Sequence, residues 1–208
     1  MYIPKSFHET DTAKLHDFMQ QHSFATLVSQ GESDLIASHL PLLLDRDAEP
    51  FGRLVGHMAK PNTQWQCADG ERVLIIFHGP HAYISPTWYE YQNTVPTWNY
   101  VAVHAYGQAK IITETEAVFQ ILEKTILTYE AAYQQQWQQL PEDYKLKLSK
   151  GIVAFEMTVN ALEGKKKISQ NRTAAEQANI IASLSKSADS NEKYIADYML
   201  KEQNLKNP

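Results

Sequence analysis

Three short groups of residues place hydrogen-bond donors and positive charge where strands are expected to end. The groups are Ser38 and His39 in one strand, then His57, Lys60 and Asn62, and finally Lys167, Ser169, Gln170 and Arg172 beyond the last strand. Lys and Arg pair with phosphate oxygens, while hydroxyl and amide groups complete the shell of such a site. The residue types therefore predict a site for a phosphate-bearing ligand. A basic run such as residues 165–167 is also typical of a solvated face.

Other common chemistries lack their signatures in this chain. No pair among the eight histidines has the spacing of a metal-binding helix, and the single cysteine, Cys67, has no activating neighbour in sequence. We find no G-x-S-x-G elbow, no Walker A loop and no G-x-G-x-x-G motif. We therefore expect no metal site and no nucleophilic catalysis, and we assign no catalytic residue.

Residues 73–107 form an aromatic-rich stretch between two apolar runs. The first run ends in Gly79 and Pro80, and the second closes at Gly107. Three of the four tryptophans lie in or beside this stretch: Trp65, Trp88 and Trp98. Flat apolar side chains suit a planar ligand, but small barrel cores and dimer interfaces use the same residue types.

Six short strands are expected before residue 114. Alternating apolar residues bounded by Gly, Pro and polar turns predict strands over 24–29, 34–45, 53–59, 71–79, 82–85 and 97–113. Pro41 marks an edge or a bulge, because proline cannot donate to a ladder. The hairpin-type links favour a closed or nearly closed antiparallel barrel.

Helices are expected before and after these strands. Thr10 and Asp11 both offer N-caps to a short helix. Thr113 with Glu116 fits a capping box that opens an amphipathic helix over 114–132.

The last part of the chain is expected to add one strand and a helical segment. Residues 151–162 alternate as a strand, and Thr173 with Glu176 fits a second capping box. The fold class is therefore α+β and mainly β. We expect a single domain over 1–208, in which 173–208 is a C-terminal helical extension.

Composition and charge limit the class of protein. A length of 208 residues and a hydrophobic content of 43% are ordinary for one globular core. A formal net charge of -5 argues against a surface that binds nucleic acid as a whole, although a local basic patch leaves DNA binding open. The cysteine usage and the lack of a signal segment or a bilayer-length apolar run predict a cytoplasmic protein with no membrane contact.

Several blocks of this sequence resemble one known family, the PaiB-like proteins, which belong to the FMN-binding split-barrel group related to pyridoxine phosphate oxidases. The family's motifs are matched in order by MYIPKSF, ASHLPLLLD, GHMAKPNTQW, IFHGPHAYISPTWY, VPTWNYVAVHAYG and KISQNR. The resemblance covers nearly the whole chain. It implies a six-stranded antiparallel split barrel with flanking helices, and a homodimer that holds FMN in a groove between protomers.

The resemblance also implies which residues contact the flavin. The ASHLP strand and the HMAKPN turn would hold its phosphate and ring edge through Ser38, His39, Leu40, His57, Met58, Ala59, Lys60 and Asn62. The KISQNR block, in one arrangement from the other protomer, would add Lys167, Ser169, Gln170 and Arg172, and the groove would be lined by Trp98 and Asn99. Lys166 stands where an aromatic residue is expected in many relatives, which leaves open whether a stacking contact or a purely electrostatic one forms there.

Two functions follow from the resemblance. The family implies negative regulation of sporulation and of degradative-enzyme production, usually described as transcriptional. The alternative is an FMN-dependent oxidoreductase that passes electrons from NAD(P)H to a small acceptor. The sequence contains no helix-turn-helix pattern, so direct DNA binding is less expected than FMN binding.

Overall fold

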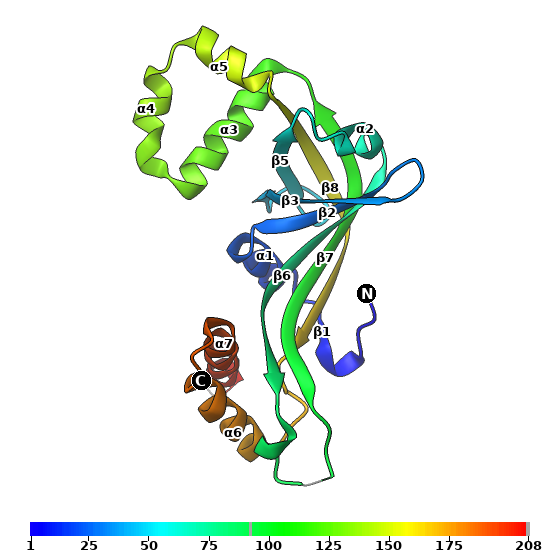
Figure 1. Ribbon diagram of the computed structural model, residues 1–208, viewed down its shortest axis with the longest axis vertical. Coiled ribbons are helices and arrows are strands. Elements are labelled where there is room, and N and C mark those ends of the chain that lie inside the picture. Colours follow the sequence, from blue (N-terminus) through cyan, green and yellow to red (C-terminus); the bar gives the residue numbers. More distant parts are fainter. Residues whose placement is uncertain (92, 207–208) are drawn as a thin grey trace. The chain divides into compact units, whose positions relative to one another are not determined.

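The computed structural model describes residues 1–91 and 93–206 (Figure 1). The chain divides into two compact units. Unit 1 comprises residues 1–10, 78–103 and the chain from 163 to the C-terminus, and unit 2 comprises residues 11–77 and 104–162. The single domain over 1–208 stays a prediction, and residues 207 and 208 of the predicted extension lie outside the described residues.

An antiparallel sheet forms the framework of unit 2. Four of its strands are β2 (Phe24–Gln30), β3 (Leu35–Pro41), β4 (Leu43–Asp45) and β5 (Arg53–Ala59). Three longer strands contribute part of their length: β6 (Arg72–Ile84), β7 (Thr97–Ile112) and β8 (Ile152–Lys167). The strand order is β3-β2-β6-β7-β8-β5-β4. Alternation explains these strands: in β2, Ala25, Leu27 and Ser29 are buried and the residues between them are not.

The core of unit 2 lies on this sheet. Its most deeply buried large side chains are Leu27, Leu54, Ile75, Phe77, Phe155 and Met157. They come from four different strands, β2, β5, β6 and β8, so the strand ends that carry polar residues are fixed by a shared apolar core.

Five α-helices belong to unit 2 in the described part of the chain. They are α1 (Thr12–Gln21), α2 (Gln64–Ala68), α3 (Thr115–Tyr129), α4 (Gln134–Gln139) and α5 (Glu142–Ser149). A 3-10 turn (Ala131–Tyr133) precedes α4. The predicted Asp11 cap is confirmed, because its Oδ1 accepts hydrogen bonds from the backbone of Ala13 and Lys14. The predicted Thr113–Glu116 capping box is wrong: Glu114 is the N-cap, and the Thr113 hydroxyl donates to the Glu114 carboxylate at 3.4 Å.

Unit 1 combines strand segments with two helices. It holds β1 (His8–Glu9), parts of β6, β7 and β8, and the helices α6 (Ala174–Ser185) and α7 (Ser190–Lys206). Short 3-10 turns cover Lys5–Phe7 and Pro86–Trp88. The capping box predicted at Thr173 and Glu176 is confirmed in both of its hydrogen bonds.

The apolar side chains of α6 and α7 form the core of unit 1 together with β6. Ile84, Ile180, Leu184, Ile195 and Ala196 are all fully buried. This burial packs α6 and α7 together. The loop before α6 carries several predicted site residues and is therefore held against a packed helix pair. In the described part of the chain, no helix is long and apolar enough to cross a lipid bilayer.

The sheet corrects the prediction of six strands in a closed or nearly closed barrel. Over the described residues it has eight strands, and its order is open, with β3 and β4 at its ends. The strand predicted over 34–45 is two strands, because the pairing partner changes at Leu42: β3 pairs with β2, and β4 pairs with β5. The Leu42 N–H donates to the Ser23 carbonyl at 2.9 Å, and the Leu42 side chain is buried.

The predicted turn at Gly79 and Pro80 is absent, so the strands expected over 71–79 and 82–85 are one strand, β6. Burial alternates up to Gly79 and resumes one residue out of phase at Ala82. A phase shift of one residue is what a β-bulge produces, and a bulge tolerates a proline that cannot donate to the ladder.

Strand β8 is longer than the predicted strand over 151–162. It continues through the basic run to Lys167, which is therefore a strand residue and not a loop residue. The extension has a partner, because His8 and Glu9 of β1 pair with Lys165 and Gly164. A two-residue partner strand at the other end of the sequence leaves no pattern that could predict this pairing.

Candidate functional site

The predicted flavin residues fall into two groups, one in each unit. Unit 2 holds Ser38, His39, Leu40, His57, Met58, Ala59, Lys60 and Asn62, and unit 1 holds Trp98, Asn99, Lys167, Ser169, Gln170 and Arg172. Polar and charged side chains occur in both groups, but only the group in unit 1 concentrates positive charge.

In unit 2, a hydrogen bond joins the turn after β5 to strand β3. The Asn62 side-chain amide donates to the Ser38 hydroxyl at 2.8 Å, and its carbonyl accepts from the backbone of Gln64 at 3.1 Å. Gln64 is fully buried, and its amide donates to Leu27, Ser29 and Ile36. These bonds fix the turn that presents Lys60. The sequence analysis did not identify Gln64, because nothing in a polar helix turn indicates complete burial.

The remaining unit 2 residues differ in what they offer a ligand. His39 shares a hydrogen bond of 3.0 Å with Thr26, and Ala59 is exposed. Burial lowers the pKa of His57, so its imidazole is neutral at pH 7. The side chains of Leu40 and Met58 belong to the core, which leaves only their backbone for a ligand.

Lys60 lies beside an aromatic ring in unit 2. Its ammonium is 4.7 Å from the centre of the Trp65 ring, and the Trp65 indole N–H donates to the Lys60 carbonyl at 3.3 Å. Both residues line a cavity of about 410 Å³. The lysine is thus positioned by a cation–π contact, and no carboxylate of the described residues forms an ion pair with it.

In unit 1, Asn99 and Ser169 are brought together. Both are buried, and their side chains share hydrogen bonds of 3.0 and 3.1 Å. Ser169 adopts a φ of 61°, in the left-handed region, which costs a non-glycine residue about 1 kcal/mol. The buried bond to Asn99 offsets this cost and fixes the loop between β8 and α6.

Lys167 and Arg172 form an uncompensated pair of cations next to this loop. The Lys167 ammonium donates to the Thr97 hydroxyl and to the Trp98 carbonyl, so one of its three donors remains for a ligand. Burial and repulsion from Lys165 and Arg172 lower the pKa of Lys167. Among the residues that the structure describes, no carboxylate is within ion-pair distance of Lys167 or Arg172. This arrangement favours an anionic ligand.

A small cavity of about 80 Å³ opens beside these cations. It is lined by Phe7, Thr97, Asn99, Lys167, Ser169, Asn171 and Arg172. The Arg172 guanidinium lies 4.0 Å from the centre of the Tyr89 ring, whose hydroxyl is buried without a partner among the described residues. Cations, amides and hydroxyls form the donor set that a phosphate group needs, so the residues present fit the phosphate of FMN. The sequence analysis did not select Tyr89 and Asn171, although they lie in the matched blocks IFHGPHAYISPTWY and KISQNR.

Gln170 and Lys166 have structural partners. The Gln170 side chain accepts from the backbone of Ile168 at 2.8 Å and donates to the carbonyls of Ser6 and Lys166. The Lys166 ammonium lies 2.8 Å from the carboxylates of both Glu9 and Glu202, and all three side chains are at least four-fifths buried. Lys166 therefore links β1 to α7 and offers no free charge to a ligand.

Replacing Lys166 with Met is expected to lower the free energy of unfolding by about 2–3 kcal/mol at pH 7, since two mostly buried carboxylates lose their cation. Burial opposes the charge of Lys166, but the hydrogen bonds that its ammonium donates to Glu202 and Glu9 outweigh this effect and raise the pKa of Lys166. The stability from this lysine is therefore present below its ordinary pKa and is lost as the pH rises through the raised value. Urea unfolding should show the two proteins converging in alkali. A difference in the free energy of unfolding that stays the same at every pH would contradict the proposed role of the Lys166 ion pairs.

Trp98 lies on the other side of strand β7 from the phosphate-sized cavity. Thr97 and Asn99 line that cavity, whereas Trp98 and Tyr100 line a second one of about 380 Å³ together with His78 and His81. The ring centres of His81 and Trp98 are 5.7 Å apart. Burial and the neighbouring His81 lower the pKa of His78. The aromatic walls of this second cavity suit a planar molecule.

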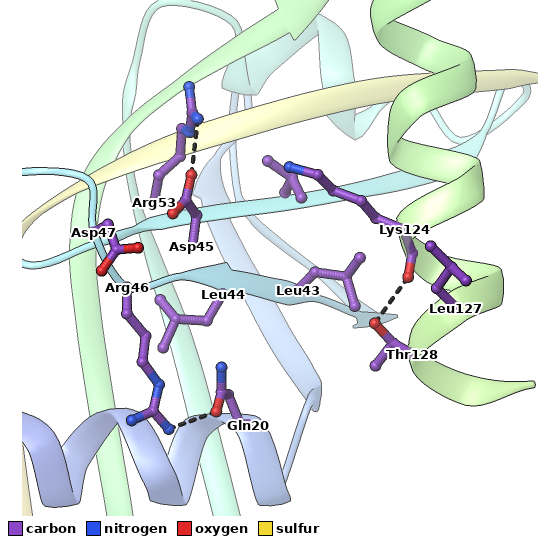
Figure 2. Close-up of a pocket in the computed structure, with 11 residues that line it drawn as sticks. Gln20, Leu43, Leu44, Asp45, Arg46, Asp47, Arg53, Lys124, Leu127 and Thr128 are labelled. Carbon is purple, nitrogen blue, oxygen red and sulfur yellow. Dashed lines mark hydrogen bonds and ion pairs between the residues drawn. The ribbon is translucent and has the colours of Figure 1, made fainter. Parts of the chain in front are cut away.

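A further cavity in unit 2, of about 490 Å³, is lined by charges that are mostly paired (Figure 2). Arg53 lies 2.9 Å from Asp45 and 3.3 Å from Glu156, and this pairing with Arg53 holds the pKa of Asp45 below its usual value. Arg46 pairs with Asp17 at 2.6 Å. Because these cations already have partners, the cavity has no clear preference for an anion.

Comparison with known proteins identifies one family. The family model described as "Putative FMN-binding domain" matches residues 1–161. The chain is 38% identical over 205 residues to the protease synthase and sporulation protein PAI 2 of Bacillus subtilis, covering 96% of each chain. It is 28% identical over 224 residues to a protein of Emericella nidulans, covering 88% of this chain and 89% of the relative.

Solved structures show the same type of fold. The flavocytochrome Anf3 of Azotobacter vinelandii has a TM-score of 0.62 at 9% identity, covering 80% of this chain and 72% of that one. The FAD and heme binding protein of Mycobacterium smegmatis has a TM-score of 0.60 at 11% identity, covering 82% and 78%. At these identities the likeness concerns the fold alone: a mainly antiparallel sheet with flanking helices.

Proposed function

The chain belongs to the family described as "Putative FMN-binding domain", and from this premise we propose that it is an FMN-binding split-barrel protein that negatively regulates sporulation and degradative-enzyme production. The regulatory part rests on the Bacillus subtilis relative, whose name refers to protease synthesis and sporulation. FMN is the cofactor that the family implies, and it would supply redox chemistry when bound.

One observation carries the flavin proposal: Lys167 and Arg172 are uncompensated cations beside a cavity whose other polar lining is amide and hydroxyl. In this proposal they hold the FMN phosphate, with Asn99 and Ser169 fixing the loop that presents them. An adenine- or ring-only ligand would leave these cations without a counter-charge, which supports a phosphate-bearing ligand.

The proposed assembly is a homodimer with FMN in a groove between protomers. The other predicted residues, from Ser38 to Asn62, contribute to the flavin site in this assembly. Exposed aromatic residues support an interface: Trp98 and Tyr83, whose ring centres are 5.7 Å apart, are both about half exposed. Molar mass measured in solution tests this assembly.

Regulation is proposed to act through the flavin state or a protein partner rather than through direct DNA contact. The formal net charge of -5 opposes binding to a polyanion, and the basic residues at 167 and 172 are those that the flavin phosphate needs. In the native host, loss of the chain should raise secreted protease and alter sporulation. Restoration by the wild-type chain but not by Arg172→Ala would support a flavin-dependent regulator, and equal restoration would contradict it.

An FMN-dependent oxidoreductase is the alternative function, and the aromatic cavity at Trp98 favours it. A planar nicotinamide is a molecule that His81, Trp98 and Tyr100 could stack against. Consumption of NADH or NADPH by FMN-loaded protein with a small acceptor tests this function. Absence of turnover would exclude a simple reductase.

A further inference from the structure

We infer that the cavity at Lys60 and Lys150 in unit 2 binds a small organic anion with an apolar body, such as a medium-chain carboxylate, in addition to the flavin site, with which it shares Lys60. This cavity of about 410 Å³ is large enough for a small ligand, because ligand pockets commonly measure roughly 300–1,000 Å³.

Two lysines, Lys60 and Lys150, line this cavity, and among the described residues neither has an ion-pair partner. The lining contains no carboxylate over the same residues. Lys60 is held in place from two sides: its backbone N–H donates to the Gly151 carbonyl at 2.8 Å, and its ammonium lies on the Trp65 ring.

The rest of the lining is largely apolar. Ile111, Val118 and Ile152 come from β7, α3 and β8, and the Trp65 ring adds a flat apolar wall. Thr113, Thr115 and Ser149 contribute hydroxyl groups. Two cations and hydroxyl groups on an apolar wall match an anionic head attached to a hydrocarbon body.

One carboxylate, that of Glu114, lies at the edge of this lining. Removing its negative charge and removing a positive charge should change the affinity for an anion in opposite directions. Glu114 is exposed and accepts a hydrogen bond of 3.4 Å from the hydroxyl of Thr113, which lines the cavity. Its negative charge opposes a bound anion. Replacing Glu114 with Gln should therefore strengthen binding, whereas replacing Lys150 with Gln should weaken it.

The experiment titrates full-length protein with sodium octanoate by calorimetry, with octan-1-ol as the uncharged probe. Octanoate should bind at one site per chain, and octanol at least about tenfold more weakly, because a hydrogen bond to a charged group contributes roughly 1.5–3 kcal/mol in general. Lys150→Gln should weaken octanoate about fivefold or more, and Glu114→Gln should strengthen it about twofold or more. Lys150 and Glu114 are exposed, so neither change threatens folding. Octanoate should also change the tryptophan fluorescence of the wild type more than that of Trp65→Phe.

A second arm separates this site from the flavin site. Lys150→Gln should leave FMN affinity unchanged, and Arg172→Ala should leave octanoate affinity unchanged. Lys60 lines the cavity and also belongs to the predicted flavin residues, so Lys150 is the diagnostic position. Equal affinity for octanol, insensitivity to Lys150→Gln, or full competition between FMN and octanoate would each overturn the inference.

Discussion

Replacing Arg172 with Ala is expected to weaken FMN binding by roughly 10- to 100-fold, because a hydrogen bond to a charged group contributes roughly 1.5–3 kcal/mol. The guanidinium lies over the Tyr89 ring and has no carboxylate partner among the described residues, so its charge is available to a phosphate. The dissociation constant from quenching of flavin fluorescence measures the effect.

Arg72→Ala is the matched control for this change. Arg72 also lies over a tyrosine, with its guanidinium 5.6 Å from the centre of the Tyr106 ring, but it lines none of the three cavities proposed to bind ligands. Arg72→Ala should leave the FMN affinity unchanged. Both Arg72→Ala and Arg172→Ala should unfold at the urea midpoint of the wild type, within error. Equal FMN affinity in the wild type and in Arg172→Ala would contradict the proposal that the FMN phosphate binds in the cavity lined by Lys167 and Arg172.

Lys60→Ala tests whether the predicted flavin residues of unit 2 contribute to FMN binding. Lys60 is exposed and already contacts Trp65, so we expect a smaller loss of FMN affinity than for Arg172, about threefold to tenfold. The sheet should remain folded, because the lysine lies in a turn. An FMN affinity equal to that of the wild type would restrict the flavin site to residues of unit 1.

Gly107→Ala is expected to destabilise the protein by about 3 kcal/mol or more, which exceeds the usual cost of overpacking because the clash is with backbone. A Cβ at this position would lie 2.1 Å from the Thr158 carbonyl oxygen and 2.8 Å from the Met157 side chain. Strands β7 and β8 are neighbours in the sheet, so they would have to separate to make room. Urea unfolding at pH 7 measures the loss.

Gly151→Ala is the control for Gly107. Its Cβ would meet only the Leu148 carbonyl oxygen, at 3.2 Å, and its φ lies outside the left-handed region. We expect a much smaller shift in the urea midpoint. Similar midpoints for the two variants would show that β7 and β8 can separate at Gly107 without cost.

Strands with a simple alternation were predictable, and strands that depend on distant partners were not. Strand β5 follows its predicted range, Arg53–Ala59, because alternate residues are buried along its whole length. The basic end of β8 has no such pattern, and it pairs with His8 and Glu9, which are remote in sequence. Likewise, β6 runs through Pro80 as one strand, whereas the sequence alone favours a turn there.

The basic run shows how far the site could be predicted. Residue types identified Lys167 and Arg172 as ligands for an anion, and the structure leaves both without a carboxylate partner among the described residues. Lys166 is identical in type and adjacent in sequence, but it is ion-paired with Glu9 and Glu202. These partners are remote in sequence, so only the folded chain distinguishes the structural lysine from the one that remains available.

The most direct test of the central claim is an FMN titration of freshly purified protein, followed by flavin fluorescence, with visible absorbance and molar mass measured on the same sample. The account predicts binding near one FMN per protomer in a dimer. A well-folded protein that shows neither flavin absorbance nor quenching of added FMN would contradict it.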